Sequence, residues 1–357
     1  MKVQSIKLNY FKRMRDLSLD FTNPETGLAK NLILLVGING TGKSTILQAI
    51  AATVGTACGR IQSSRDLDWP GFNWDISDNN WGGFNSQIEM SIEFSQIEIE
   101  ATRRFSKEVG MNREGWSLPS EQRVVRLNLT KPNDRAVAPE GREALFQFKG
   151  REYAKQLVTR EGFQVFEQVG TILWYTEQRN STSLTPEDNN KEINFTEDKL
   201  RDRLSKFRQF HQSVISGQIQ ELRPGQKDLY AEIEAAYHKV FSERVFEGPI
   251  PRYDMDDILE EPWFYLFDQN GNHQYELSEM SGGERAIFPI LFDFVKWNVH
   301  NSIILIDELE LHLHPPMQQA LLRALPSLGK NNQFIITTHS DYIEQLVPDD
   351  CIVRMDG

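Results

Sequence analysis

The clearest candidate for chemistry is a glycine-rich loop that ends in a lysine and two hydroxyl side chains. It fits the pattern G-x-x-x-x-G-K-[ST], with a buried strand expected before it and a helix after it. Backbone N–H groups of such a loop can surround phosphate, helped by the helix N-terminus. Lys43 would reach the β- and γ-phosphates, and the Ser44 hydroxyl would ligate Mg²⁺. The residues expected to bind a nucleotide are Gly37, Asn39, Gly40, Thr41, Gly42, Lys43, Ser44 and Thr45.

A second candidate is the acidic pair Asp307-Glu308, which follows the apolar run 303–306. Ligands of open α/β sheets bind at the carboxyl ends of the strands. Asp307 suits a water-mediated contact with Mg²⁺, and Glu308 suits the orientation or deprotonation of an attacking water. Such pairs are common by chance, so this interpretation depends on the phosphate loop.

The segment Ser281-Gly282-Gly283-Glu284 opens an expected helix and forms a second anion-binding N-terminus. One nucleotide needs one phosphate cradle. We therefore expect this segment to contact the γ-phosphate of a nucleotide held by another subunit; the alternative is an ordinary helix cap. His339 ends the apolar run 334–338, where it would contact the γ-phosphate or serve a structural role.

The elements needed to position these residues are expected from the apolar pattern. The runs 32–36, 172–175, 303–306 and 334–338 predict strands buried on both faces, as in a parallel sheet. Helices are expected after the glycine-rich loop and near 283–299 and 316–325. Strands that alternate with helices predict an α/β fold.

The middle of the chain follows a different pattern. Alternation at 88–94 and 125–129 predicts an antiparallel sheet with one wet face, and the shift to Ile97 and Ile99 predicts a hairpin or bulge at Ser95-Gln96. Helical segments around 200–215 and 229–240 could pack as an antiparallel pair, with a break at residues 223–225.

Composition sets broad limits. The chain has 357 residues, a net charge of −12 and two cysteines, Cys58 and Cys351. The acidic balance argues against a general nucleic-acid coat but not against a local basic groove. No apolar stretch of the sequence approaches the roughly 18 consecutive residues of a membrane-spanning helix. The opening residues do not resemble a secretory leader, so the cytoplasm is the expected compartment.

Together these motifs resemble the head of an ABC-type ATPase. The glycine-rich loop is similar to the family's Walker A motif, Ser281–Glu284 to its signature, 303–308 to its Walker B motif and His339 to its switch histidine. The following segment 309–315 resembles the RecF/SMC and OLD-like branch. In that branch a basic side chain packs near the adenine, which here corresponds to Lys12 and Arg13.

The resemblance is firm over residues 1–55 and 275–345, and it implies a P-loop NTPase with ATP and Mg²⁺ as cofactors. It divides the chain into a first lobe (1–179) with the P-loop and a β-subdomain, an α-helical insert (180–275) and a second lobe (276–357). It assigns catalysis to Glu308 and His339. Gln178, just after the expected strand 172–175, is a candidate Mg²⁺ ligand, the alternative being an exposed polar turn.

The resemblance also implies a homodimer or higher homo-oligomer formed through the ATP sites. No long coiled coil interrupts the chain, and 18 residues follow His339, too few for the nuclease domain of OLD proteins. We therefore expect regulation or scaffolding of a separate effector, a nuclease or toxin, in bacterial defence or DNA maintenance, without a membrane partner.

Two alternatives stay open. The first is a RecF-like DNA-binding repair ATPase acting without an effector, in which four arginines could form a DNA-facing strip. The alternative is that these arginines simply lie on a solvent-exposed strand face. The second is a scaffold that does not hydrolyse ATP, against which Glu308 argues. The four arginines are Arg103, Arg104, Arg123 and Arg126.

Overall fold

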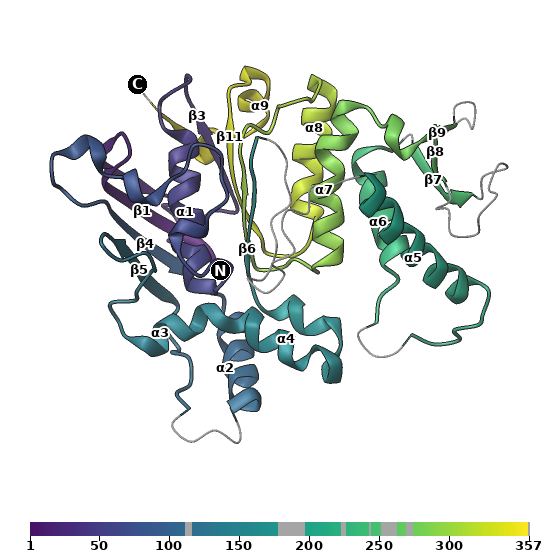
Figure 1. The fold of residues 1–357 in the computed structure, drawn as a ribbon, viewed down its shortest axis with the longest axis horizontal. Helices are drawn as coiled ribbons and strands as arrows, with labels where there is room; N and C mark the ends of the chain where they lie inside the picture. The colour runs from purple at the N-terminus through teal and green to yellow at the C-terminus, as the bar shows by residue number, and fades with distance from the viewer. Residues whose placement is uncertain are drawn as a thin grey trace.

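A central parallel sheet with helices on both faces organises the molecule (Figure 1). The computed structural model describes residues 1–110, 116–177, 197–222, 226–242, 244–250, 263–268 and 274–355. Helix α1 (Lys43–Cys58) covers one face of the sheet, whereas α7 (Gly282–Lys296) and α8 (Pro315–Ala324) cover the other. The α/β fold expected from the sequence is therefore present.

The parallel sheet has the strand order β12-β3-β11-β10-β6. Successive residues of β10 point to opposite faces, so Leu305 packs on the α1 side and Ile304 on the α7 side. Burial on both faces explains the continuous apolar runs, and the four expected strands are confirmed. The strands are β3 (Leu32–Val36), β6 (Ile172–Tyr175), β10 (Ile303–Ile306), β11 (Gln333–Thr338) and β12 (Ile352–Arg354).

A four-stranded antiparallel sheet lies beyond α1, with the order β2-β1-β4-β5. Its alternating residues bury Ile88, Met90 and Ile92 against the same core as α1, which confirms the antiparallel sheet expected from residues 88–94 and 125–129. The strands are β1 (Lys2–Phe11), β2 (Met14–Asp20), β4 (Gln87–Glu93) and β5 (Val124–Thr130).

The hairpin or bulge expected at Ser95-Gln96 is wrong, because helix α2 (Gln96–Gly110) begins there. Ser95 Oγ accepts a hydrogen bond from the Glu98 backbone N–H (3.3 Å), and Glu98 accepts from Ser95 N–H (3.0 Å). This reciprocal capping is a helix-start signal that outweighs the apparent alternation. Helices α3 (Arg142–Phe146) and α4 (Gly150–Glu161) follow, and α4 packs on α2.

The range 180–275 is not only helical. Helices α5 (Glu197–Ile215) and α6 (Leu229–Val240) pack on α7, where Phe207 stacks on Phe292 with ring centroids 6.1 Å apart. Three antiparallel strands follow, in the order β7-β8-β9. They contain aromatic and β-branched residues in short runs, which the helical interpretation overlooked. These strands are β7 (Arg244–Ile250), β8 (Trp263–Asp268) and β9 (Gln274–Glu276). The expected break at 223–225 lies outside the described residues.

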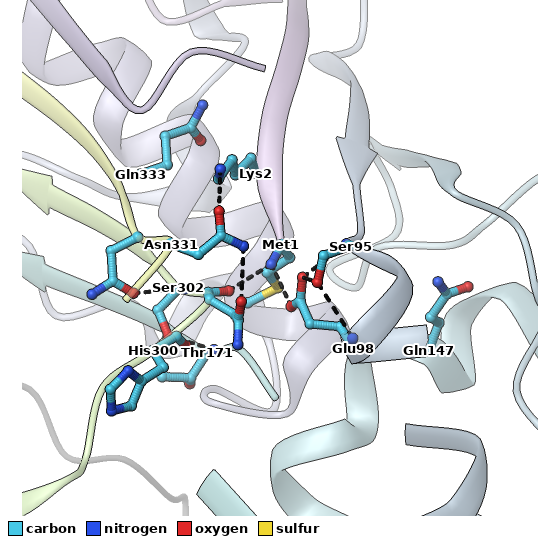
Figure 2. Close-up of polar contacts among 12 residues, drawn as sticks. Met1, Lys2, Ser95, Glu98, Gln147, Thr171, His300, Ser302, Asn331 and Gln333 are labelled. Atoms are coloured by element: carbon cyan, nitrogen blue, oxygen red, sulfur yellow. Dashed lines mark hydrogen bonds and ion pairs between the residues drawn. The ribbon is translucent and has the colours of Figure 1, made fainter. Parts of the chain in front are cut away.

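Polar side chains join the two large sheets at the amino ends of the parallel strands (Figure 2). Gln333 of β11 is fully buried; its Oε1 accepts from Val3 N–H (2.7 Å) and its Nε2 donates to Val3 C=O (2.9 Å). Nearby, Lys2 donates to Asn31 (2.7 Å) and Asn331 (2.5 Å). Strand β1 is therefore bonded directly to the parallel sheet, and these hydrogen bonds hold the two sheets together.

The remaining described elements are short. Helix α9 (Asp341–Leu346) begins with a cap from Ser340. Among the helices in the described part of the chain, none has the length and apolar character of a membrane span. The 3₁₀ turns are Ser64–Asp66, Trp74–Ile76, Asn79–Trp81, Gln147–Lys149, Phe163–Gln168, Leu277–Glu279, Leu325–Ser327 and Asp349–Cys351.

Candidate nucleotide site

The glycine-rich loop connects β3 to α1, as its motif requires. Gly42 precedes the helix with φ of 95°, a left-handed conformation that favours glycine. At Gly37 an added Cβ would lie 2.6 Å from the carbonyl oxygen of Met355, the residue after the edge strand β12, so there is no room for a side chain there. Glycines at these positions let the backbone form a closed loop at the carboxyl edge of the sheet.

Lys43 lies at the centre of the site. Its Nζ donates to the carbonyl oxygens of Gly37 (2.7 Å) and Ile38 (3.1 Å) and lies 3.4 Å from Nδ1 of His339. Burial lowers the pKa of Lys43, and the nearby Glu308 and Asp307 carboxylates oppose that shift. The ammonium therefore already occupies the position between the loop and the acidic strand end that a phosphate-binding lysine needs.

Asp307 follows β10 and faces helix α1. Its Oδ1 accepts hydrogen bonds from Ser44 Oγ (3.0 Å) and Thr337 Oγ1 (2.6 Å). A serine hydroxyl and a carboxylate are hard oxygen donors of the kind that Mg²⁺ prefers. Because the two already lie within hydrogen-bonding distance, the pair fits a metal bound by Ser44 directly and by Asp307 through water.

Glu308 adopts φ of 49°, a left-handed conformation that is uncommon for a residue with a side chain. Its backbone N–H donates to Thr337 Oγ1 (2.8 Å), and its Oε1 lies 3.7 Å from His339 Nε2. Burial and the neighbouring Asp307 raise the pKa of Glu308, whereas His339 has the opposite effect. A carboxylate with a raised pKa next to a phosphate-binding lysine is suited to act on a water.

The segment Ser281–Glu284, the expected signature, caps the N-terminus of helix α7. Ser281 Oγ accepts from Glu284 N–H (3.3 Å), and Glu284 Oε2 accepts from Ser281 N–H (2.9 Å) and Oγ–H (2.8 Å). The other oxygen, Oε1, accepts from the hydroxyls of Tyr237 (2.7 Å) and Tyr275 (2.6 Å). Ser281 and Gly282 are exposed, and a Cβ at Gly282 would meet open space.

Three further candidates fall in different places. Lys12 Nζ donates to Gln48 of α1 (2.7 Å) and to the Gly71 carbonyl (2.7 Å). Arg13 reaches the glycine-rich loop, with Nη1 3.9 Å from a Cβ built at Gly40. Their contact with adenine stays a prediction. Gln178 lies outside the described residues.

The four arginines lie on different elements. Arg103 and Arg104 lie on helix α2 rather than on a strand, and Arg126 lies on β5. Each of the four forms an ion pair with a carboxylate, which favours the interpretation that they are ordinary solvent-exposed residues. The pairs are Arg103–Glu121 (2.9 Å), Arg104–Glu161 (3.0 Å), Arg123–Glu93 (2.8 Å) and Arg126–Glu140 (2.7 Å).

Sequence reasoning missed four residues that organise this site: Thr337, Glu310, Tyr237 and Tyr275. Thr337 is a polar residue at the end of an apolar strand, a signal that could have been used. Glu310, two positions after Glu308, was noticed only as part of the segment 309–315. The two tyrosines carry no sequence signal, because they lie 47 and 9 positions from Glu284.

The chain is similar to several known proteins. A family model described as "AAA domain, putative AbiEii toxin, Type IV TA system" matches residues 32–343, and one described as "AAA domain" matches residues 1–54. The retron Ec83 probable ATPase of Escherichia coli is 26% identical over 96% of this chain and 69% of its own length. The Septu protein PtuA of Bacillus mycoides (strain KBAB4) is 23% identical over 95% of this chain and 38% of its own length.

The fold also has a counterpart among solved structures. An Smc head crystallised with the C-terminal winged-helix domain of ScpA superposes with a TM-score of 0.51 at 15% identity, covering 99% of this chain and 94% of that one. At this identity the likeness concerns the fold alone, and it confirms the expected architecture of an ABC-type ATPase head.

Proposed function

We propose that this chain, which belongs to the AAA-domain family whose model matches residues 32–343, is a subunit that binds and hydrolyses ATP with Mg²⁺. The observation that carries the proposal is the convergence of Lys43, Ser44, Asp307, Glu308 and His339 at one edge of the parallel sheet. These side chains come from α1 and from the ends of two neighbouring strands, β10 and β11.

Each residue has a distinct part in hydrolysis. Gly37–Gly42 and Lys43 hold the phosphates, and Ser44 with Asp307 would hold Mg²⁺, which neutralises charge on the phosphate oxygens when bound. Glu308 orients the attacking water and accepts its proton. His339 lies between Lys43 and Glu308, where its ring can contact the γ-phosphate and report its presence.

The second part of the proposal concerns the partner subunit. In a head-to-tail homodimer, the exposed Ser281 and Gly282 of one copy face the γ-phosphate held by the other. The N-terminus of α7 supplies backbone N–H groups and a favourable dipole for that charge. Binding at two shared sites then converts ATP occupancy into assembly, and hydrolysis loosens the pair. A higher homo-oligomer can be built on the same contact.

We further propose that the ATP-linked assembly regulates or scaffolds a separate effector, a nuclease or toxin, in bacterial defence. The names of the retron and Septu relatives support this setting. The RecF-like alternative predicts that DNA stimulates turnover. The pairing of the four arginines with carboxylates does not favour it.

The test is the solution mass of Glu308→Gln by light scattering, with and without ATP and Mg²⁺. We expect a shift from 41.2 kDa to twice that mass only with nucleotide. Adding Gly282→Glu should abolish the shift, because the new carboxylate would repel phosphate across the interface. Gly282→Ala is the matched control, since its methyl group enters open space. Gly283 is unsuitable, because a Cβ there would lie 2.7 Å from Met317 Cε within the same chain.

An unchanged mass with ATP would overturn assembly through ATP. Turnover in Lys43→Ala equal to that of the wild type would overturn hydrolysis at this site. For the effector, the wild-type gene and Lys43→Ala should be compared in phage challenge within the native locus, where equal protection would contradict a role for this ATP site in defence.

A further inference from the structure

Glu310 has no part in the proposed hydrolysis, yet both of its carboxylate oxygens face the turn that carries His339. Its Oε2 accepts a hydrogen bond of 2.8 Å from Thr338 Oγ1, and its Oε1 accepts from the backbone N–H of His339. The carboxylate therefore spans two consecutive residues after β11. Hydrogen bonds to a charged acceptor are stronger than those between neutral groups, so this contact restrains the turn.

Two more hydrogen bonds tie the same segments together. The Oγ1 atom of Thr337 accepts a hydrogen bond from the backbone N–H of Glu308 (2.8 Å). The carbonyl oxygen of Thr337 accepts one from the backbone N–H of Leu309 (3.1 Å). Glu308 is held in a left-handed conformation that a residue with a side chain adopts only when its surroundings impose it. The loop after β10 and the turn after β11 thus form one bonded unit.

The position of the His339 ring depends on that unit. One ring nitrogen lies 3.4 Å from Lys43 Nζ and the other 3.7 Å from Glu308 Oε1. Only one methylene group joins the imidazole to the His339 backbone. A small rotation of this backbone would therefore move the ring away from both Lys43 and Glu308. A bond to the backbone N–H is a direct way to prevent this rotation.

We infer that Glu310 is a positioning residue, which holds the His339 backbone so that the imidazole stays between Lys43 and Glu308. It acts through His339 and does not touch the nucleotide. Both of its oxygens accept bonds from the turn, whereas Asp307 faces Ser44. The inference rests on the proposed ATPase function, which it deepens.

The first test needs no nucleotide. Hydrogen–deuterium exchange of the peptide that contains His339 is compared in the wild type, Glu310→Ala and Glu344→Gln. Glu344 is the control because it also forms a bond, to Arg354 (2.6 Å), but on α9. We expect the His339 amide to exchange about tenfold faster in Glu310→Ala and unchanged in Glu344→Gln. Equal exchange in Glu310→Ala and the wild type would overturn the inference.

The second test is a double-mutant cycle on ATP turnover. Glu310→Gln should lower kcat about tenfold while KM changes less than about twofold, because the residue acts on the reaction and not on nucleotide binding. In a His339→Ala background the same change should lower kcat by less than about twofold. Additive losses would overturn the inference, as would a higher Mg²⁺ requirement, which would make Glu310 a metal ligand.

The two tests separate this inference from the proposed function. If Lys43→Ala and Glu308→Gln both retain full turnover, the site does not hydrolyse ATP and the proposed function fails. The exchange experiment still decides whether Glu310 holds the turn. If turnover depends on those residues but Glu310→Ala leaves the amide exchange unchanged, only the inference about Glu310 fails.

Discussion

Thr337 and Asp307, which are 30 positions apart in the chain, share a hydrogen bond of 2.6 Å at the carboxyl edge of the parallel sheet. The same Thr337 oxygen accepts the backbone N–H of Glu308 (2.8 Å). One buried hydroxyl therefore orients both acidic residues of the site. It places Asp307 toward Ser44 and fixes the start of the loop that turns Glu308 toward His339.

Replacing Thr337 by valine removes this hydroxyl with little change in shape. We expect the free energy of unfolding to fall by about 1–3 kcal/mol, because Asp307 loses a donor and the Glu308 N–H loses its acceptor. ATP turnover should fall about tenfold, since Asp307 and Glu308 each lose a hydrogen bond that orients them. Chemical denaturation and steady-state turnover measure the two effects.

The matched control is Thr53→Val. The Thr53 hydroxyl is also fully buried, on α1, but has no hydrogen-bond partner among the described residues. That change should be neutral or stabilising, and Thr337→Ser should retain most of the turnover. If the Thr337→Val and Thr53→Val proteins behave alike, the hydroxyl of Thr337 has no organising role.

Glu308 predicts a specific dependence on pH. Burial and Asp307 raise its pKa above the usual 4.5, so the fold favours the protonated form. The associated stability is complete below pH 4.5 and is lost as the pH rises through the raised pKa. At pH 7 the ionised carboxylate is therefore unfavourable, and Glu308→Gln should be more stable than the wild type while its turnover falls about 100-fold or more.

Denaturation of both proteins between pH 4 and pH 8 checks this sign. The advantage of Glu308→Gln should shrink as the pH falls toward 4.5, where the wild-type carboxyl also becomes neutral. As the pH is lowered, wild-type turnover should begin to decline at a pH above the pKa of an ordinary glutamate. A stability advantage that grows toward low pH would contradict the argument.

Glu284 links the signature to the insertion. Burial alone would raise its pKa, but hydrogen bonds from Tyr275, Tyr237 and Ser281 produce a net lowering. The double change Tyr237→Phe/Tyr275→Phe removes both hydroxyls and should cost about 2–4 kcal/mol at neutral pH, because the buried carboxylate loses donors. Since a lowered pKa contributes stability above about pH 4.5, this cost should fade in acid.

ATP-linked dimerisation should weaken in the same variant, because Glu284 holds both the N–H and the hydroxyl of Ser281. Tyr153→Phe is the comparison. Tyr153 belongs to a separate core with α2, so the loss of its hydroxyl should affect stability without changing dimerisation measured by light scattering. If dimerisation is unaffected by the loss of both tyrosine hydroxyls, the insertion has no influence on the signature segment.

Much of the fold was predictable because the signal lies within short segments. The runs 32–36 and 303–306 are apolar at every position, as strands covered on both faces must be. By contrast, the segment Ser95–Glu98 was interpreted as a hairpin or bulge because apolar residues alternate at positions 97 and 99. The capping pair Ser95 and Glu98, which starts a helix, was given too little weight. The strands β7–β9 were missed because residues 180–275 were interpreted from their two helices.

The sequence by itself determined the chemical groups and their local geometry: the phosphate loop between strand and helix, the acidic pair at a strand end, and the capped signature. These depend on residues a few positions apart, whose spacing sets their relative placement. Only the tertiary structure decided which partners complete them: Thr337 on Asp307, Glu310 on His339, and two tyrosines on Glu284. Those contacts join residues as much as 47 positions apart, and only packing of the elements brings them within hydrogen-bonding distance.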